Sequence, residues 1–227
     1  MKPLVIAIDG PAGAGKSTVA RRVARMLGLL FLDTGAMYRA LTWRALQAGM
    51  DLADEAALAR LARESRIELE AAEAGDRVRI DGQDVTEAIR TPEVTRRVSE
   101  VARVGAVREH LVGLQQALGK EGGVVAEGRD IGTVVFPRAD LKIFLVASPA
   151  ERARRRARDL EKAGHTVDLA ALEAEIERRD AIDSNREHSP LRPAEDAVLL
   201  DSDHLTASEV VDAILERARR LQLPAES

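Results

Sequence analysis

The chain has 227 residues, 45% of them hydrophobic and 32% charged, which predicts one globular domain, or one domain with a large insertion, and excludes disordered and low-complexity classes. Its 34 basic and 38 acidic side chains nearly cancel to a net charge of −4, so no global basic field indicates a nucleic-acid partner. The absence of cysteine excludes disulfide scaffolds, thiolate nucleophiles and Cys-ligated metal sites.

The first predicted element is a strand over residues 4–8. Its run of apolar residues is continuous, as in a parallel-sheet strand that is buried on both faces. Asp9 interrupts the run, which is too short for a signal-peptide core or a membrane span. We therefore expect a cytoplasmic protein that does not bind membranes.

A glycine-rich segment follows this strand and matches the phosphate-loop pattern G-x-x-x-x-G-K-[ST] at the start of a predicted helix. Its backbone N–H groups would surround the polyphosphate of a bound nucleotide, Lys16 would reach the β- and γ-phosphates, and the Ser17 hydroxyl would contact Mg²⁺. A glycine-rich turn with an incidental lysine is the alternative, which the complete motif in this context disfavours. The predicted ATP-binding residues are Gly10, Pro11, Ala12, Gly13, Ala14, Gly15, Lys16, Ser17 and Thr18.

Helices and strands alternate through the first half of the chain. An amphipathic helix over 17–27 with Gly28 as its cap precedes a strand at 29–32 and helices at 33–48 and 54–64. Between residues 67 and 91 the pattern changes to a two-residue alternation with turn signals at 74–76 and 81–82, which predicts a small antiparallel insertion. Thr91-Pro92 then begins a helix that runs to 102, and another helix covers 106–118.

The second half returns to buried strands, at 124–126, 141–146 and 197–200. Capping boxes that begin at Ser148 and Thr206 open two helices, and a third helix is expected over 168–179. This alternation predicts an α/β fold, a five-stranded parallel sheet with helices on both faces. We expect a single domain over 1–227, with a β-containing insertion and a helical lid.

A phosphate loop by itself does not distinguish GTPases, ATPases and small-molecule kinases. A GTPase would ordinarily carry D-x-x-G and N-K-x-D segments. No aspartate lies three residues before any glycine here, and Asn185, the single asparagine, is followed by Arg186. These absences disfavour a GTPase.

Three further segments, taken with the phosphate loop, closely resemble bacterial cytidylate kinases, and the resemblance covers essentially the whole chain. It implies ATP-dependent, Mg²⁺-assisted phosphoryl transfer to CMP or dCMP in pyrimidine nucleotide metabolism, by a monomer whose partners are these small molecules. In that family the inserted segment, about 60–105 here, binds the nucleoside monophosphate, and about 150–168 forms the lid. The three segments are Asp33-Thr34-Gly35-Ala36-Met37-Tyr38-Arg39, Gly128-Arg129-Asp130-Ile131-Gly132-Thr133, and Arg179-Asp180 with Asp183 and Asn185-Arg186.

The resemblance also implies roles for individual residues. Those at the acceptor phosphate are Arg39, Arg129 and Arg186, those at the ribose are Arg179 and Asp183, those at the base are Ser99, Arg108 and Asp130, and Asp33 and Thr34 complete the CMP site. Arg152 and Arg156, four apart in the lid, would cover the donor ATP. The implied catalytic residues are Lys16, Arg129, Arg156 and Arg186.

The chemistry of these residue types agrees with the implied roles. A guanidinium presents a fixed fork that matches phosphate oxygens. A carboxylate at Asp130 accepts a hydrogen bond from the cytosine amino group, whereas the carbonyl of uracil at that position would repel it. Arg108 would donate to the cytosine acceptors.

Each assignment has a structural alternative. With 29 arginines, any single one is ordinarily a solvated surface residue. Asp130 could instead be a turn residue or pair with Arg129, and Ser99 and Arg108 could belong to an exposed helix face. The charged run from Glu151 to Arg158 could be a solvated helix paired internally; we assign Arg154 to the surface and leave Arg155 and Arg158 open.

Two other functions stay open at this point. The chain could be another small-molecule kinase, for AMP, UMP or a metabolite alcohol, or a nucleotide-binding regulatory protein. A regulatory protein has no need of a second arginine-lined phosphate pocket, which favours the kinase.

Overall fold

The computed structural model describes residues 3–70, 76–162 and 164–222. The chain divides into two compact units, the first formed by residues 1–31 with 121–227 and the second by residues 32–120. The segment 60–105, expected to bind the nucleoside monophosphate, lies in the second unit. The segment 150–168, expected to form the lid, lies in the first.

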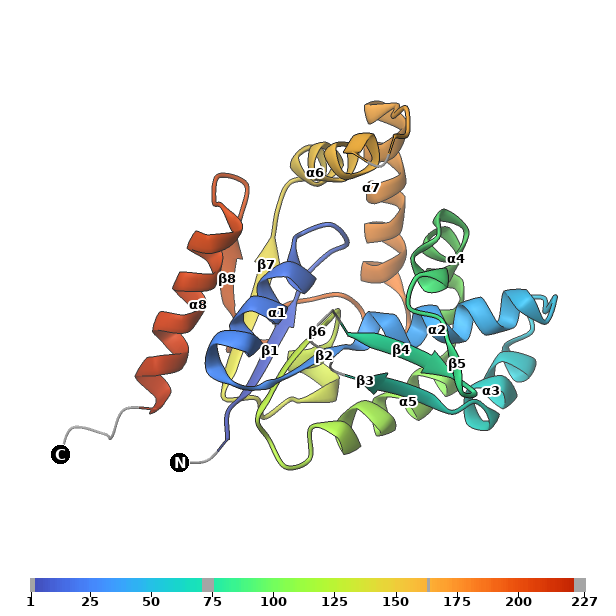
Figure 1. The fold of residues 1–227 in the computed structure, drawn as a ribbon, viewed down its shortest axis with the longest axis horizontal. Helices are drawn as coiled ribbons and strands as arrows, with labels where there is room; N and C mark the ends of the chain where they lie inside the picture. The colour runs from blue at the N-terminus through green and yellow to red at the C-terminus, as the bar shows by residue number, and fades with distance from the viewer. Residues whose placement is uncertain (1–2, 71–75, 163, 223–227) are drawn as a thin grey trace. The chain divides into compact units, whose positions relative to one another are not determined.

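A five-stranded sheet organises the first unit (Figure 1). The central strand β1 pairs in parallel with both β6 and β7, and Asp9 is in register with Gly128. The expected α/β class with a five-stranded parallel sheet is confirmed. In the order β2-β6-β1-β7-β8 the strands are β2 (Leu30–Asp33), β6 (Val124–Gly128), β1 (Val5–Asp9), β7 (Leu141–Val146) and β8 (Val198–Asp201).

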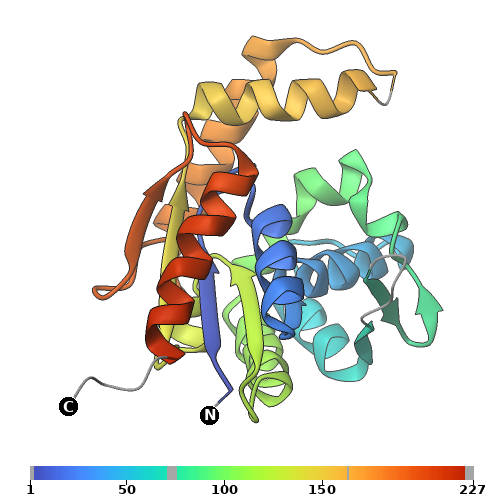
Figure 2. The ribbon, with the colours of Figure 1, turned by 60° about the vertical axis from the view of Figure 1, so that its left-hand side comes forward.

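Two helices, α1 (Lys16–Leu27) and α8 (Ala207–Gln222), pack against each other and against this sheet (Figure 2). Their apolar sides join those of the strands in one core, which includes Ile6, Val23 and Ile214. Helix α1 ends at Gly28 in the left-handed conformation, with φ of 65°, as the sequence predicts. The capping box of α8 is present, because the Thr206 N–H donates to Glu209 Oε2 at 2.7 Å and the Glu209 N–H to Thr206 Oγ1 at 3.3 Å.

Helices α6 (Pro149–Lys162) and α7 (Leu169–Asn185) pack against each other, with α6 lying across the top of Figure 1 and α7 running downward from it. The Glu151 N–H donates to Ser148 Oγ at 3.2 Å, which is one of the two bonds of the expected capping box. The second bond is absent, because the Ser148 N–H donates to Asp203 Oδ1 at 2.7 Å and not to Glu151. The end expected for α7, at residue 179, is wrong, because the helix continues to Asn185. No glycine or proline stops it before Pro190, and its extension buries Asp183.

In its described residues, the second unit contains four α-helices and a small antiparallel sheet, which confirms the expected antiparallel insertion. Helix α2 contacts α4 and β4, and its buried face carries Met37 and Leu41 into the core of this unit. Of the turn expected at 74–76, residues 74 and 75 lie outside the described residues. The elements are α2 (Thr34–Gln47), α3 (Glu55–Glu64), β3 (Ile67–Glu70), β4 (Arg77–Ile80), β5 (Gln83–Asp84), a 3₁₀ turn (Ala88–Arg90), α4 (Pro92–Ala102) and α5 (Gly105–Leu118).

One element has no counterpart among the sequence-based expectations. A π-helical turn over Ile131–Val135 follows β6 and contacts β1. Five residues are too few to show helical periodicity, so the pattern of apolar residues could not predict it.

Among the helices of the described segments, none is both long enough and apolar enough to cross a membrane.

Gly10 is required by the close approach of β7. A Cβ atom at Gly10, where φ is +148°, would lie 2.0 Å from the carbonyl oxygen of Leu145. We expect Gly10→Ala to lower the free energy of unfolding by about 3 kcal/mol or more, because backbone must move. Urea denaturation measures this. The matched variant is Gly28→Ala, where φ is +65° but the space is open, and it should cost only about 1 kcal/mol. Equal losses in the two variants would contradict the steric explanation.

Candidate functional site

The phosphate loop lies between the carboxyl end of β1 and the first residue of α1. Gly13 and Gly15 have φ values of 79° and 89°, a left-handed conformation that favours glycine. The loop thus ends directly at a helix N-terminus, whose backbone N–H groups carry partial positive charge. This arrangement of strand, loop and helix is the one that the motif predicts.

Lys16 is buried in this loop, and its ammonium group donates to the carbonyl oxygen of Pro11 at 2.7 Å. Burial, together with the charges of Arg129 and Arg179, lowers the pKa of Lys16 from 10.5 to about 7, while Glu127 and Asp9 act in the opposite direction. A bound polyphosphate would add negative charge beside Lys16 and favour its charged form.

The residues of the loop fit a magnesium ion that arrives with the nucleotide. Ser17, in the first turn of α1, supplies a hydroxyl. The described residues contain no group of three or more His, Asp or Glu side chains that could hold a metal ion. Mg²⁺ in nucleotide sites is held mainly by phosphate oxygens and water, with few protein ligands. Ser17 is therefore the residue expected to hold it.

Asp9 connects the end of β1 to the segment that follows β6. Its two carboxylate oxygens accept hydrogen bonds from the backbone N–H groups of Ile131 and Gly132, both at 2.7 Å. Burial raises the pKa of Asp9 from 3.8 to about 6, against the lowering effect of these two bonds. Asp9 was not among the predicted site residues. The signal was present, since Asp9 is a charged residue at the end of a buried strand.

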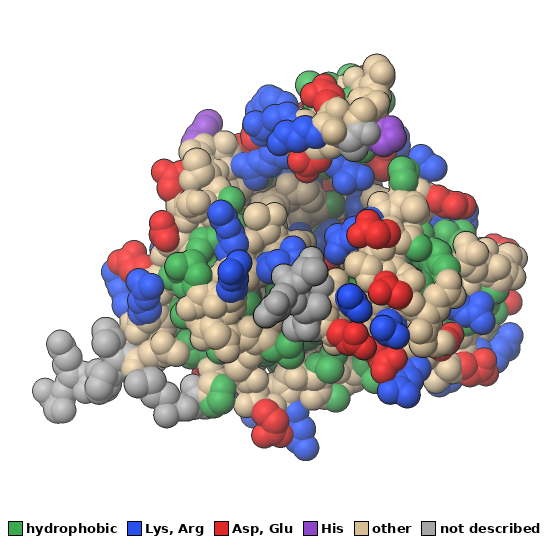
Figure 3. All heavy atoms as spheres, in the orientation of Figure 1, with side chains coloured by type: hydrophobic (Ala, Val, Ile, Leu, Met, Phe, Trp, Pro, Cys, Tyr) green, Lys and Arg blue, Asp and Glu red, His purple; other side chains and the backbone are tan. Residues whose placement is uncertain are grey.

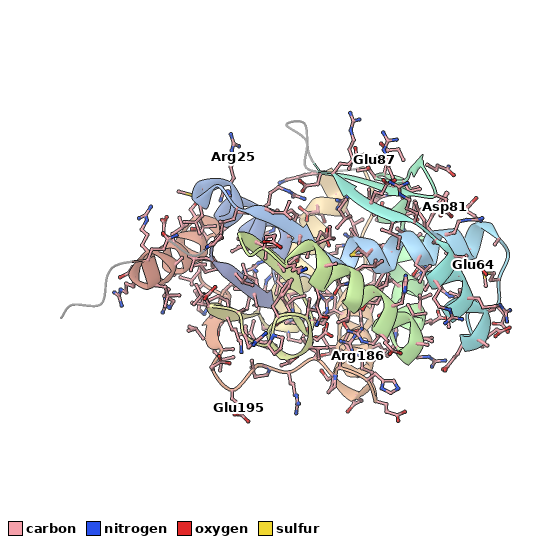
Figure 4. The ribbon with its side chains drawn as sticks, turned by 90° about the horizontal axis from the view of Figure 1, so that it is seen from below. Arg25, Glu64, Asp81, Glu87, Arg186 and Glu195 are labelled. Carbon is pink, nitrogen blue, oxygen red and sulfur yellow. The ribbon has the colours of Figure 1, made fainter. Side chains whose placement is uncertain are left out.

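Arginines and aspartates from the segment after β6 and from α7 form buried ion pairs. Arg129 Nε donates to Asp183 Oδ2 at 2.9 Å, and Arg186 Nη2 lies 3.9 Å from Asp130 Oδ1. Arg186 is the C-cap residue of α7 and is labelled in Figure 4. Although burial acts to raise it, the charges of Arg129, Arg179 and Arg186 lower the pKa of Asp183 below its usual 3.8. The first unit thus brings together five of the predicted CMP-binding residues.

The structural alternative for Asp130 was an ion pair with Arg129. Asp130 does face an arginine, but a different one. Asp130 faces Arg186, whereas Arg129 pairs with Asp183. Asp130 is also the N-cap residue of the π-helical turn, but its side chain makes no capping hydrogen bond there. Its carboxylate is therefore directed to a charged side chain and not to the turn.

The other predicted CMP-binding residues lie in the second unit. Asp33 caps α2 by accepting from the Ala36 N–H at 2.9 Å, Thr34 is buried at the start of that helix, and Arg39 donates to Thr95 Oγ1 at 2.9 Å. The local sequence Asp33-Thr34 thus explains where α2 begins.

Ser99 and Arg108 are buried, with 8% and 4% of their surfaces exposed, so the alternative of an exposed helix face is wrong for both. Arg108 Nη1 donates to the carbonyl oxygen of Ala102 at 3.0 Å, and its guanidinium lies 5.2 Å from the centre of the Tyr38 ring. A buried arginine held over an aromatic ring has a restricted orientation, which suits a recognition role. Tyr38, like Thr95, was not predicted as a neighbour of the site residues.

Arg152 of α6 is in direct contact with the phosphate loop. Its guanidinium donates to the carbonyl oxygens of Ala147 at 2.9 Å and Ala12 at 3.0 Å, and to Asp180 Oδ2 at 2.5 Å. A Cβ atom at Gly13 would lie 3.3 Å from the Cβ of Arg152. With only 3% of its surface exposed, Arg152 joins the loop, α6 and α7.

The other arginines of α6 differ from Arg152. Basic side chains gather over this helix on the surface (Figure 3). Glu151 pairs with Arg154, Arg155 and Arg158 at 2.9, 3.1 and 3.4 Å, which is the internal pairing expected of a solvated charged helix. Arg156 is exposed, although it lies only one turn beyond the buried Arg152.

Comparison with known proteins identifies the family. The family model described as cytidylate kinase matches residues 6–220. The chain belongs to the cytidylate kinase family. A cytidylate kinase from Desulforamulus reducens is 57% identical over 210 residues, which cover 92% of this chain and 94% of that protein.

Other similar relatives are longer proteins. A bifunctional pantoate ligase/cytidylate kinase from Prochlorococcus marinus is 57% identical over 224 residues. The match covers 98% of the present chain but only 44% of that longer protein. A crystal structure of an uncharacterized protein from Eubacterium ventriosum superposes with a TM-score of 0.52 at 12% identity. The superposition covers 96% of the present chain and 99% of that protein. That likeness concerns the fold alone.

The ion pair of Asp183 generates a prediction about acid stability. Because its folded pKa is depressed, Asp183 stabilises the fold above its unfolded pKa, and this contribution is lost as the pH falls through the folded pKa. We expect Asp183→Asn to lower the free energy of unfolding by about 3 kcal/mol at neutral pH. The difference in unfolding free energy between wild type and variant, the gap, should shrink as the pH falls below about 4. Urea denaturation across pH measures the gap.

The matched variant for this prediction is Glu216→Gln, which removes the exposed pair with Arg220 on α8. It should cost less than about 1 kcal/mol at neutral pH. A gap for Asp183→Asn that does not depend on pH would contradict the role of the carboxylate charge.

Proposed function

We propose that the protein transfers the γ-phosphoryl group of ATP to CMP or dCMP and releases ADP with CDP or dCDP. One observation carries the proposal: the phosphate loop after β1 and the Arg129 and Asp130 segment after β6 leave the same edge of one sheet. In open parallel sheets ligands bind at the carboxyl ends of the strands, and this edge carries both a phosphate loop and buried arginines.

The chemistry needs no covalent intermediate. Phosphoryl transfer depends on aligning an acceptor oxygen with the γ-phosphorus and on neutralising the charge of the transferred group. Lys16 would hold the β- and γ-phosphates, and Arg129, Arg156 and Arg186 would neutralise charge around the transferred group. Bound Mg²⁺ supplies additional charge neutralisation at the phosphates. An acceptor phosphate is already ionised near neutral pH, so no strong general base is required.

The residues proposed to bind CMP keep the assignments that the family resemblance implies. In the first unit, Arg129 and Arg186 are assigned to the acceptor phosphate, Arg179 and Asp183 to the ribose, and Asp130 to the base. In the second unit, Arg39 is assigned to the phosphate, Ser99 and Arg108 to the base, and Asp33 and Thr34 complete the set. The burial of Ser99, Arg108 and Asp130 supports base recognition, since buried polar groups discriminate strongly between partners.

On the donor side, Arg152 and Arg156 are assigned to ATP. The hydrogen bond from Arg152 to Ala12 supports a place beside the phosphate loop. We further propose a single kinase domain, with the nucleoside monophosphate-binding segment and lid at the expected positions, that works in the cytoplasm as a monomer.

A coupled assay with CMP, dCMP, UMP and AMP tests this function. We expect ADP formation that depends on CMP or dCMP and is matched by CDP or dCDP. Lys16→Met is the control, and it should lose at least about 100-fold in turnover, or ~2.7 kcal/mol of transition-state stabilisation, while remaining folded. Preferred turnover of AMP, UMP or an alcohol would replace the proposed acceptor. ATP hydrolysis that no acceptor stimulates would favour a regulatory protein.

Asp130 is the proposed source of base selectivity. In Asp130→Asn the amide can turn its NH₂ group towards the uracil carbonyl. The kcat/KM for CMP should therefore fall, and the kcat/KM for UMP should rise relative to that for CMP. We expect the discrimination to narrow by about 1 to 3 kcal/mol, as measured by kcat/KM for the two nucleotides. Equal losses for CMP and UMP would mean that Asp130 serves only to orient Arg186.

A further inference from the structure

The π-helical turn after β6 is capped by a residue that is distant in sequence. Turns and helices ordinarily have their first N–H groups satisfied by the side chain of the N-cap residue. Here the N-cap residue Asp130 makes no such bond. The N–H groups of Ile131 and Gly132 instead donate to the two carboxylate oxygens of Asp9, both at 2.7 Å.

The two bonds from Asp9 fix the backbone directly after Asp130. Asp130 is 5% exposed and its Oδ1 faces Arg186 Nη2 at 3.9 Å. A backbone held at residues 131 and 132 limits the positions that the neighbouring Asp130 can adopt.

Asp9 is also fixed in relation to the phosphate loop. It is the last residue of β1, it immediately precedes Gly10, and it is in register with Gly128 of β6. The turn packs closely against Asp9 and Lys142, because a Cβ atom at Gly132 would lie 3.3 Å from Asp9 Oδ2 and 3.2 Å from Lys142 Cδ. One buried side chain thus joins the start of the phosphate loop to the segment that carries Arg129 and Asp130.

We propose that Asp9 is a positioning residue: by capping the turn at residues 131 and 132 it holds Arg129 and Asp130 in place relative to the phosphate loop, including the Asp130 carboxylate that faces Arg186. The inference rests on the proposed function for the identity of what Asp130 recognises. Asp9 itself touches neither nucleotide in this proposal. It acts through the backbone of the turn.

The test variant is Asp9→Asn, which keeps one acceptor oxygen but places an NH₂ group against a backbone N–H. We expect the ratio of kcat/KM for CMP to that for UMP to narrow about tenfold, because Asp130 is no longer fixed. The matched control is Asp140→Asn. Asp140 also accepts a backbone N–H of β1, that of Val5 at 2.8 Å, but at the opposite end of the strand. This control should leave the ratio within about twofold of wild type.

A double variant separates positioning from general loosening of the fold. In the Asp130→Asn background, adding Asp9→Asn should change the CMP to UMP ratio by less than about twofold, because Asp9 acts on the base only through Asp130. Independent, multiplying effects of the two substitutions would overturn the proposal. If Asp9→Asn does not fold, Asp9→Glu replaces it. Glu keeps the charge and both oxygens but shifts them, and an unchanged ratio in that variant would also count against positioning.

Hydrogen exchange measured by mass spectrometry supplies a readout that needs no substrate. Peptides covering 129–135 should exchange at least about tenfold faster in Asp9→Asn than in wild type or Asp140→Asn. Unchanged exchange would overturn the capping role whatever the enzyme phosphorylates. If the wild-type protein does not use CMP but this exchange accelerates, the proposed function fails while the capping role stands.

Discussion

The parallel pairing of β1 with β6 and β7 is the constraint on which the rest of the site depends. Both edges of β1 are hydrogen-bonded to a neighbouring strand, which fixes where β1 ends. The pairing also places Asp9 in register with Gly128. The phosphate loop and the Arg129 segment therefore leave the sheet at one level. The approach of Leu145 to Gly10 shows how little room the neighbouring strand leaves for the loop. The phosphate loop and the Arg129 segment follow directly on paired strands, and groups anchored on strands are held more precisely than groups on long loops.

Buried charges in the first unit are organised by opposite charges. Arg129 and Arg186 face Asp183 and Asp130, and Arg152 faces Asp180. A buried charge without a partner is costly, so these carboxylates allow arginines to be held ready in a water-poor environment. The pairs also fix the direction of each guanidinium. An arginine already oriented loses less conformational entropy when a phosphate binds.

Asp9 and Asp130 are both buried aspartates, but they make different interactions. Asp9 satisfies backbone N–H groups, and Asp130 faces a side chain. Neither role follows from the residue type, because both are buried carboxylates at strand ends. Their environments differ only in what the tertiary structure brings beside them. A long-range contact, and not the local sequence, therefore decides which groups each carboxylate faces.

Much of the local structure could be predicted from the sequence, because its causes lie within a few residues. Continuous apolar runs indicated the buried strands, and Gly28, Thr91-Pro92 and Thr206 to Glu209 marked helix ends through local hydrogen bonds or backbone preference. The phosphate loop was recognisable because its glycines, Lys16 and Ser17 are contiguous. The family's other motifs were visible for the same reason.

What the tertiary structure alone decided involves residues far apart in the chain. The unexpected extension of α7 carries Asp183 to Arg129, 54 residues away, and the first N–H groups of the π-helical turn bind Asp9, more than 120 residues away. Likewise, nothing in the local pattern separates Arg152, buried on the phosphate loop, from Arg156, exposed one turn later. Sequence by itself determined most of the elements, the phosphate loop and the family resemblance, but not the π-helical turn or the end of α7. The choice of partner for each buried charge was left to the fold, because electrostatic and hydrogen-bond partners are set by distance in space and not by spacing along the chain.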